Sequence, residues 1–370
     1  MKVMTVLGTR PEIIRLSRII ARLDVLTAHV LVNTGQNHSA SLSDNFFTEL
    51  GVRAPDHHFG ISEPDFARQI GRILSASHDV IKSERPDRLL ILGDTNSALA
   101  AIAAKRLGVP VFHMEAGNRC YDPRVPEEVN RRLVDHSSDV LMPYTERSRQ
   151  NLLREGFAPD RVFVTGNPIG EVMMAYADRI DASQILNILE LAPKRYMLAT
   201  LHRAENVDEP DRLAIYATAL KQIARVHDVP IIVSTHPRTR QRLDNAGVLD
   251  GGGVRWLEPF GFCDFVALEK NALCVLSDSG TVQEECAILG VPNVTLRDVT
   301  ERPETIECGS NILAGASVEA ILRAVSLVVR NAPRWIAPLE YQTPDVSGTV
   351  LRLVTGHVHG LPQSNAPSRH

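Results

Sequence analysis

The chain has 370 residues, of which 44% are hydrophobic and 23% charged, and its formal net charge is −4. This composition is that of an ordinary soluble globular protein, and at ~150 residues per domain the length allows two domains. The small negative charge argues against a protein that coats nucleic acid or an anionic membrane. No apolar stretch approaches the ~18 residues of a membrane span, and Val3 already lies in a strand-like run without a signal-like preamble, so we expect a cytoplasmic protein.

Short apolar runs alternate with amphipathic helical stretches along the first half of the chain, which is the pattern of a parallel α/β sheet. Each run ends in a turn that contains glycine, histidine or other polar residues. As strands we expect residues 3–7, 29–33, 88–92, 109–113, 140–143 and 162–165.

The second half repeats this alternation, with strands expected at residues 196–200, 229–234, 254–257, 273–276 and 291–296. No repeated motif makes the two halves sequence duplicates. The Gly-Asn-Pro sequence at 166–168 separates the two sets and is the best candidate for a linker. The sequence therefore predicts two doubly wound α/β domains of similar build.

Acidic, cationic and imidazole side chains lie where many of these strands end. In open parallel sheets ligands bind beyond the carboxyl ends of the strands. Taken singly, each residue has a helix cap or an ion pair as its commoner role. Taken together, they indicate a cleft that holds a charged polar ligand and performs acid–base chemistry on it. They are Arg10, Asp94, Glu115, Glu127, Arg131, His202 and Arg203.

Residues 277–285 place small residues at the start of a helix that follows a buried strand. Free backbone N–H groups and the helix dipole favour an anion there, and Gly280 lets the backbone approach it closely. Glu285 lies one turn behind Thr281 on the same face, where its carboxylate could accept hydrogen bonds from ribose hydroxyls. A helix cap with a solvated pair of glutamates is the structural alternative. The Glu-Arg-Pro-Glu loop at 301–304 adds charged groups and favours a nucleoside diphosphate site.

Several motifs of cofactor-dependent and nucleophilic enzymes are missing from the sequence. The turn at Gly8 is not G-x-G-x-x-G, no Walker sequence occurs, and no Tyr is followed four residues later by Lys, so hydride chemistry has little support. There is also no H-E-x-x-H, no C-x-x-C and no G-x-S-x-G. We therefore expect no metal, no cofactor and no acyl-transfer nucleophile, and reduced thiols at the five cysteines.

Seven short motifs follow one another along the chain: GTRPE at 8–12, GDT at 93–95, HMEAG at 113–117, PEEVNRR at 126–132, HRAEN at 202–206, SDSGTVQEE at 277–285 and TERPE at 300–304. By this combination the chain resembles the non-hydrolysing UDP-N-acetylglucosamine 2-epimerases, from residue 1 to about 355. The resemblance implies a GT-B fold, in which two Rossmann-like domains face a central cleft, and a homodimer.

Domain boundaries follow from the same resemblance. Residues 1–167 would form an N-terminal domain that carries the catalytic acids, and residues 168–340 a C-terminal domain that binds UDP. Residues 341–357 would form a helix that returns to the N-terminal domain, and residues 358–370 a disordered tail.

The implied reaction inverts C2 of a UDP-N-acetylhexosamine, by default UDP-GlcNAc to UDP-ManNAc, for the synthesis of surface polysaccharide precursors. Similar enzymes eliminate UDP to form a 2-acetamidoglucal and then add UDP back, with a proton delivered to the other face of C2. A UDP-sugar is the only partner that this reaction needs. Arginines and a helix N-terminus would stabilise the charge that builds on the departing diphosphate.

Carried over motif by motif, the resemblance assigns roles to individual residues. The diphosphate would be held by Arg10, His202, Arg203, Ser279, Gly280 and Arg302. Glu285 would bind the ribose, and the substrate site would also include Arg15, Phe265 and Thr281. The candidates for proton transfer are Asp94, Glu115, Glu127 and His202. Arg131 would keep one of these acids ionised.

The chain departs from the common pattern of this family at four places. Arg15 stands where Lys is usual, and Thr281 where a second Gly is usual. Residues 117–126 replace the common GLRT stretch and resemble members that act on modified UDP-hexosamines, such as UDP-diacetamido-uronic acids or UDP-N-acetyl-L-talosamine. Regulated members bind a second UDP-sugar near a Gln-His pair, which here reads Gln-Asn-His at 36–38.

Two other functions share the fold and the UDP site that the motifs imply. A GT-B glycosyltransferase would not require both the Glu115 and the Glu127 motifs. A UDP-sugar-binding regulatory protein would tolerate the loss of these acids, so their presence argues against it.

Overall fold

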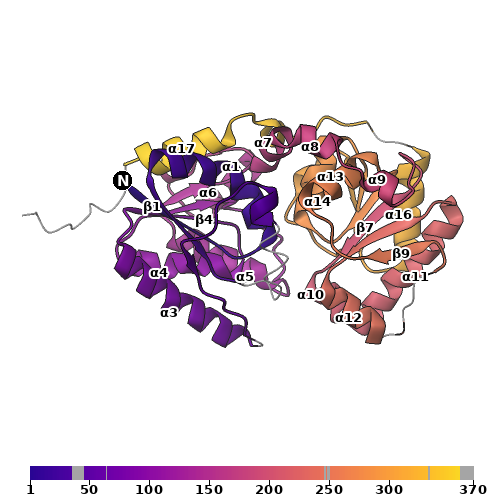
Figure 1. Ribbon diagram of the computed structural model, residues 1–370, viewed down its shortest axis with the longest axis horizontal. Coiled ribbons are helices and arrows are strands. Elements are labelled where there is room, and N and C mark those ends of the chain that lie inside the picture. The colour runs from indigo at the N-terminus through magenta and orange to yellow at the C-terminus, as the bar shows by residue number, and fades with distance from the viewer. Residues whose placement is uncertain (36–45, 64, 246, 248–250, 332–333, 359–370) are drawn as a thin grey trace, which may run out of the picture. The chain divides into compact units, whose positions relative to one another are not determined.

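The computed structural model describes residues 1–35, 46–63, 65–245, 247, 251–331 and 334–358. The chain forms two compact units: unit 1 comprises Met1–Val172 and Thr343–His370, and unit 2 comprises Met173–Gln342. Within the described residues, each unit contains one six-stranded sheet whose neighbouring strands run parallel. Helices cover both faces of each sheet (Figure 1), which makes both units α/β.

Unit 1 has the strand order β3-β2-β1-β4-β5-β6. Its strands are β1 (Lys2–Leu7), β2 (Ala28–Asn33), β3 (His57–His58), β4 (Arg88–Leu92), β5 (Val111–Met114) and β6 (Val140–Met142). Its helices are α1 (Arg10–Leu26), α3 (Phe66–Glu84), η1 (Asn96–Leu99), α4 (Ala100–Arg106), α5 (Pro126–Ser137), α6 (Glu146–Arg154), η2 (Pro159–Arg161) and α17 (Val346–Gly356), and α7 (Pro168–Ala175) crosses the boundary between the units. Figure 1 shows α1 and α17 on one face of the sheet and α3 and α4 on the other.

Unit 2 has the strand order β12-β11-β10-β7-β8-β9, which is the topology of unit 1 counted from β7. Its strands are β7 (Met197–Leu201), β8 (Ile231–Thr235), β9 (Val254–Leu257), β10 (Val275–Ser277), β11 (Asn293–Thr295) and β12 (Asn311–Leu313). Its helices are α8 (Ala177–Asp181), α9 (Ile185–Ile188), α10 (Ala204–Val207), α11 (Pro210–His227), α12 (Pro237–Asn245), α13 (Phe262–Asn271), α14 (Gly280–Leu289), α15 (Pro303–Glu307), α16 (Val318–Arg330) and η3 (Leu339–Gln342). Helices α11 and α16 pack on one face of the sheet, and Figure 1 shows α13 and α14 on the other.

Strand order places the functional loops of each unit. Both sheets are doubly wound, and the chain reverses its direction of winding between β1 and β4 in unit 1 and between β7 and β10 in unit 2. Ligands of such sheets bind beyond the carboxyl ends of the strands at this switch point. The loops that follow these four strands are therefore the first place to look for a site.

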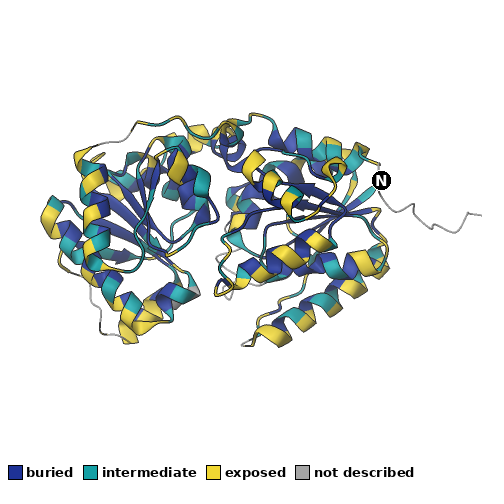
Figure 2. Ribbon diagram, turned by 180° about the vertical axis from the view of Figure 1, so that it is seen from behind, coloured by how far each residue is buried: buried dark blue, intermediate teal, exposed yellow. Residues whose placement is uncertain are grey.

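The apolar runs of the sequence become strands because they are buried on both faces. In β1 and β4 every residue from Val3 to Leu7 and from Arg88 to Leu92 is buried, and parallel strands between two helical layers have this character. Figure 2 shows the sheets buried and the outer helix faces exposed. None of the described helices combines the length and apolarity needed to cross a membrane.

One expected strand does not form, and two short strands were not expected. At 162–165 only Val162 pairs, in an isolated parallel bridge with Leu141. The neighbouring β6 ends at Met142 because Pro143 has no N–H group with which to continue the ladder. The edge strands β3 and β12 are two and three residues long, too short to produce an apolar run. Residues 36–38, and residues 359–370 of the expected tail, lie outside the described residues.

Helix α17 belongs to unit 1, although it follows unit 2 in the chain. It packs against α1, and its first turn is held by Glu171, whose carboxylate accepts hydrogen bonds from the backbone N–H of Ser347 (2.8 Å) and from the Ser347 hydroxyl. Arg22 on α1 contacts Asp345, the N-cap of α17, at 2.7 Å. The Arg88 guanidinium donates to the carbonyl of Val354 near the other end of the helix.

We predict that Glu171→Ala lowers the free energy of unfolding by about 2 kcal/mol, because it leaves a buried backbone N–H and a hydroxyl without their acceptor. The measurement is urea denaturation followed by circular dichroism. Asp79→Ala, at an exposed position of α3, is the matched control and should change stability by less than ~0.5 kcal/mol. Equal effects of the two substitutions would contradict the role of Glu171.

Candidate active site

Glu12 organises the loops that follow β1 and β4. Its buried carboxylate accepts hydrogen bonds from the backbone N–H of Gly8 (3.0 Å) and Thr9 (2.7 Å) and from the hydroxyls of Thr9 (2.8 Å) and Thr95 (3.0 Å). Thr9 and Glu12 form a capping box at the start of α1. Burial raises the pKa of Glu12 to about 7, although these donors act in the opposite direction. Sequence reasoning placed Glu12 in a motif without assigning it this role.

Glu115 and Arg15 form a buried ion pair at the end of β5. The distance from Arg15 Nη1 to Glu115 Oε2 is 2.6 Å, and Asn118 donates to the other carboxylate oxygen at 3.2 Å. Glu115 has φ = 66°, a left-handed conformation that is uncommon for residues other than glycine and is found more often at functional sites. A guanidinium at this distance favours the ionised carboxylate.

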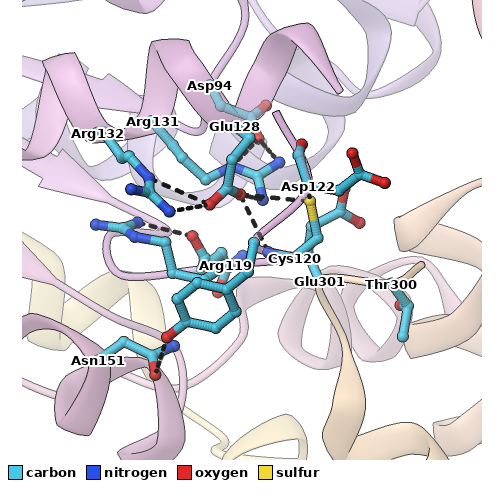
Figure 3. A network of polar contacts seen from close by, with 12 residues as sticks. Asp94, Arg119, Cys120, Asp122, Glu128, Arg131, Arg132, Asn151, Thr300 and Glu301 are labelled. Carbon is cyan, nitrogen blue, oxygen red and sulfur yellow. Dashed lines mark hydrogen bonds and ion pairs between the residues drawn. The ribbon is translucent and has the colours of Figure 1, made fainter. Parts of the chain in front are cut away.

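Asp94 and Arg131 form a second acid–arginine pair, between the loop after β4 and helix α5. Arg131 donates to one carboxylate oxygen of Asp94 through Nε (3.1 Å) and Nη2 (2.7 Å). Its Nη1 donates to Glu128 at 3.1 Å (Figure 3). The sequence predicted that Arg131 pairs with an acid, and the structure brings it to two.

Glu128 is a site residue that sequence reasoning missed. It is buried and accepts hydrogen bonds from the backbone N–H of Cys120 (3.0 Å) and from Arg132 (2.9 Å), in addition to Arg131 (Figure 3). Burial opposes ionisation, but these donors and the charge of Arg131 hold the pKa of Glu128 below its ordinary value. The neighbouring Glu127, which the sequence favoured, is half-buried in the first turn of α5.

Asp135 fixes the start of the stretch at 117–126 from within the core. It accepts hydrogen bonds from His113 Nδ1 (2.9 Å), Arg119 Nη2 (2.7 Å) and the backbone N–H of Gly117 (3.2 Å). His113 Nε2 lies 2.8 Å from the carbonyl oxygen of Gly93, so this network also reaches the loop that carries Asp94. Burial works against ionisation of Asp135, but His113 and Arg119 hold its pKa below the ordinary value.

Gly117 could not be replaced without moving the chain. Its φ is 79°, and a Cβ atom at this position would lie 2.3 Å from the carbonyl oxygen of Ser148. Arg119 is pinned by Asp135 and, through Nε (2.8 Å) and Nη2 (2.6 Å), by Glu155. The start of the stretch 117–126 is therefore held in place. Further along the stretch, Arg124 is exposed and contacts Asp122, which is labelled in Figure 3.

Arg10 lies at the start of α1, beside the loops that Glu12 organises. Its guanidinium stacks over the ring of Phe46, 5.4 Å from the ring centroid, and burial lowers the pKa of the guanidinium from its ordinary value.

In unit 2, Asp278 holds the loop that follows β7. Its buried carboxylate accepts hydrogen bonds from the backbone N–H of His202 (3.0 Å), from that of Arg203 (3.0 Å) and from the Asn206 side chain (3.1 Å). The imidazole Nδ1 of His202 lies 3.1 Å from the other carboxylate oxygen. Burial opposes ionisation, but these groups hold the pKa of Asp278 far below its ordinary value. The His202 ring stays partly exposed.

The N-terminus of α14 is flanked by a buried guanidinium. Ser279 is the N-cap, and Gly280 and Thr281 form the first turn. Arg302 pairs with Glu284, and its Cζ would lie 3.6 Å from a Cβ atom on Gly280. The positive end of the helix dipole and a guanidinium therefore meet at one point, which favours an anion.

The two glutamates of α14 have different surroundings. Glu284 is fully buried and bound to Arg302. Glu285 is 3% exposed and interacts with Glu269 on α13. Phe265, four residues before Glu269, is half-buried.

Arg203, on the loop that Asp278 holds, lies 4.0 Å from Glu301, which also binds the buried Arg297 at 2.8 Å.

The described residues contain no group of three or more His, Cys, Asp or Glu side chains that could hold a metal ion. The five cysteines, all within the described part of the chain, are free thiols.

Comparison with known proteins adds independent findings. The family model described as UDP-N-acetylglucosamine 2-epimerase matches residues 23–354. A UDP-N-acetylglucosamine 2-epimerase of Methanocaldococcus jannaschii is 40% identical over 348 residues, which cover 91% of this chain and 95% of that protein. A UDP-2,3-diacetamido-2,3-dideoxy-D-glucuronate 2-epimerase of Pseudomonas aeruginosa is 38% identical over 330 residues, which cover 88% and 91%.

Solved structures are also similar to this chain. The crystal structure of the M. jannaschii UDP-GlcNAc 2-epimerase in complex with UDP-GlcNAc and UDP is 38% identical to this chain, with a TM-score of 0.91 and coverage of 96% of this chain and 99% of that chain. A glycosyltransferase involved in lipopolysaccharide biosynthesis has a TM-score of 0.61 at 12% identity, covering 96% and 100%. At that identity the likeness shows the fold alone, which is GT-B.

We predict that Asp278→Asn lowers the free energy of unfolding by about 2 kcal/mol at pH 7, because it removes the charge that three donors and His202 surround. An acid whose pKa falls on folding stabilises the native state above its unfolded pKa of ~3.9. The difference between wild type and variant should therefore narrow as the pH falls below ~4.

Tryptophan fluorescence during urea denaturation measures this effect, because Trp256 and Trp335, the two tryptophans of the chain, lie in unit 2. Asp298→Asn is the matched control: Asp298 forms a surface pair with Arg212 at 2.9 Å and should contribute less than ~1 kcal/mol. A difference between wild type and Asp278→Asn that stays constant down to pH 3 would contradict the assignment.

Proposed function

Because the chain belongs to the UDP-N-acetylglucosamine 2-epimerase family, whose members are isomerases, we propose that it inverts C2 of a UDP-N-acetylhexosamine, by default UDP-GlcNAc to UDP-ManNAc. The observation that carries the proposal is the buried Arg15–Glu115 pair at the end of β5. A protein that only binds a UDP-sugar does not require an ionised acid held in a left-handed conformation at a strand end. The product would serve as a precursor of surface polysaccharide.

Unit 2 supplies the groups that suit the UDP part of the substrate. We assign the diphosphate to the N-terminus of α14 (Ser279, Gly280 and Thr281), to Arg302 beside it, and to His202 and Arg203 on the loop that Asp278 holds. From unit 1, Arg10 is assigned to the diphosphate as well. The ribose is assigned to Glu285 and the uracil ring to Phe265. The structure of the M. jannaschii relative contains UDP-GlcNAc and UDP, which supports a UDP site in this family.

The proposed chemistry is an elimination followed by an addition. A base removes the proton from C2 while the C1–O bond to UDP breaks, which gives a 2-acetamidoglucal and free UDP. The C1–O bond then forms again as an acid delivers a proton to the opposite face of C2. Negative charge grows on the diphosphate as the bond breaks, so cationic side chains and helix N–H groups stabilise the transition state.

The acids of unit 1 are the proposed proton carriers. Asp94 and Glu115 are each paired with an arginine, at 2.7 Å and 2.6 Å, which favours their ionised forms before reaction. Glu127 and His202 are the further candidates. Arg15 takes the place of the family's usual Lys, and it brings the same charge to the Glu115 carboxylate through Nη1.

A modified sugar is the second candidate substrate, because the P. aeruginosa relative is a UDP-2,3-diacetamido-2,3-dideoxy-D-glucuronate 2-epimerase at 38% identity. A uronic acid carries a carboxylate that requires a cation. Arg124, in the stretch 117–126 where the chain departs from the common pattern, has a side chain that is 75% exposed. Arg119 is a poorer candidate, because its side chain is fully buried between Asp135 and Glu155, whereas the pair of Arg124 with Asp122 lies at the surface.

A glycosyltransferase with the same fold remains the competing function. Its product would contain a new glycosidic bond, and hydrogen at C2 of the sugar would not exchange with solvent. The homodimer that the family resemblance implies stays a prediction, which sedimentation equilibrium tests.

We expect that incubation of the protein with UDP-GlcNAc in deuterated water gives UDP-ManNAc with deuterium at C2. NMR of the C2 position measures this exchange. Free ManNAc and UDP would indicate a hydrolysing enzyme instead. Exchange with a UDP-diacetamido-uronic acid, and none with UDP-GlcNAc, would change the substrate and keep the mechanism. Absence of exchange with every UDP-hexosamine would contradict the proposal.

Glu115→Gln should reduce the rate of C2 exchange by ~100-fold or more, because the amide cannot carry the proton. UDP binding, measured by calorimetry, should stay within about twofold of wild type, since we assign UDP to other residues. Glu146→Gln, at the exposed start of α6, is the control and should leave both unchanged. Loss of UDP binding in Glu115→Gln would show that Glu115 binds the nucleotide, which contradicts its role as a proton carrier.

Arg124→Ala tests the choice of sugar. If the substrate is a uronic acid, the substitution should raise KM for that sugar by roughly tenfold, the effect of losing a charged hydrogen bond. KM for UDP-GlcNAc should change less than twofold. Steady-state kinetics with both sugars measures the two values. An equal change in KM for both UDP-sugars would show that Arg124 does not bind the carboxylate of the uronic acid.

A further inference from the structure

A second buried carboxyl lies against Glu285. Glu269 on α13 has no exposed surface, and Glu285 on α14 is 3% exposed. Glu285 is the group whose charge and hydrogen bonding act on Glu269. Neither carboxylate oxygen of Glu269 accepts a hydrogen bond from a described N–H or O–H donor. Glu269 therefore lacks the compensation that Asp135 and Asp278 receive.

Two ionised carboxylates are not stable in such a place. Burial without a cation costs several kcal/mol for each charge, and like charges in contact add to this cost. Burial, and after it the Glu285 carboxylate, raise the pKa of Glu269 well above its ordinary value. With a proton on Glu269, the contact between the two groups becomes a hydrogen bond that an O–H donates to a carboxylate.

Two thiols and a phenol near this pair are also neutral, and Lys194, whose ammonium donates to the carbonyl of Ala272 at 2.8 Å, is a cation of the same neighbourhood that acts on Cys286. Burial raises the pKa of the Cys274 and Cys286 thiols. Burial likewise raises the pKa of Tyr196, whose hydroxyl donates to the carbonyl of Leu268 at 2.5 Å. The carboxyl of Glu269 is therefore a donor for the Glu285 carboxylate.

The two helices present their residues in matching order. Phe265 and Glu269 are four residues apart on α13, and Thr281 and Glu285 are four apart on α14, so each pair lies on one helix face. Phe265 is half-buried, and Thr281 belongs to the anion-binding end of α14. Glu269 thus lies one turn behind Phe265, as Glu285 lies one turn behind Thr281.

We propose that Glu269 is a positioning residue for the nucleoside: its protonated carboxyl donates a hydrogen bond to Glu285 and fixes the Glu285 carboxylate in the orientation that accepts both ribose hydroxyls. A carboxylate has about four lone-pair sites, which is enough to accept from Glu269 and from two ribose hydroxyls. The inference rests on the proposed function, because it takes Glu285 as the ribose acceptor. Glu269 itself does not touch the substrate.

Calorimetry with UDP and 2′,3′-dideoxy-UDP tests the inference on three proteins: wild type, Glu269→Gln and Glu269→Leu. The glutamine amide still donates a hydrogen bond, so Glu269→Gln should bind UDP within about twofold of wild type. Glu269→Leu removes the donor and should bind UDP roughly tenfold more weakly, the effect of one hydrogen bond to a charged group. Dideoxy-UDP has no ribose hydroxyls and should bind all three proteins within about twofold of one another.

Each other outcome overturns the inference in a distinct way. If Glu269→Leu binds UDP as tightly as wild type, or loses the same affinity for UDP and for dideoxy-UDP, Glu269 contributes packing alone. If wild type binds UDP and dideoxy-UDP equally, Glu285 does not bind the ribose, although a UDP-sugar function stands. If wild type does not bind UDP, the proposed function fails together with the inference.

Infrared spectroscopy gives a second measurement that does not depend on the folding of Glu269→Leu. At neutral pH the difference spectrum of wild type minus Glu269→Gln should show the carbonyl band of a protonated carboxyl group, because the bands of other protonated acids such as Glu12 cancel. A difference spectrum without this band would show that Glu269 is ionised and would overturn the inference.

Discussion

The compensation of buried carboxylates is the constraint on which the candidate site residues of both units depend. A carboxylate removed from water costs several kcal/mol unless donors surround it. Asp135 in unit 1 and Asp278 in unit 2 meet this requirement by accepting hydrogen bonds from the backbone of the loops themselves. The loop after β5 in unit 1 and the loop after β7 in unit 2 are thereby held by buried acceptors, which fixes the backbone from which their side chains project.

The acids of unit 1 divide according to what surrounds them. Asp135 and Glu128 are enclosed by three or more donors and have little or no exposed surface. Asp94, by contrast, keeps a side chain that is 23% exposed, although Arg131 holds it. Asp135 and Glu128 hold the loops, whereas Asp94 retains exposed surface. The same contrast in unit 2 separates Asp278 from the partly exposed His202 that it orients.

Local signals predicted the fold, and they predicted the partners of individual residues less well. The alternation of apolar runs and helical stretches correctly indicated two parallel sheets, and the order of seven motifs correctly indicated the family. The choice between Glu127 and Glu128 depends on the rotation of α5 about its axis, which packing decides and the sequence does not state. The contact of Glu269 with Glu285 joins two helices, and no motif includes Glu269. The roles of individual site residues stay predictions.

Unit 1 is assembled from two separated segments of the chain, whereas unit 2 is one continuous segment. A ribosome releases the chain from its N-terminus, and domains generally fold as units while they emerge. Unit 2 therefore has all of its residues before unit 1 receives α17. Until that moment, α1 lacks the helix that packs against it, and Glu171 lacks its Ser347 donors. The unit begun first is completed last, so a nascent chain halted before residue 343 carries an unfinished apolar face that chaperones can recognise.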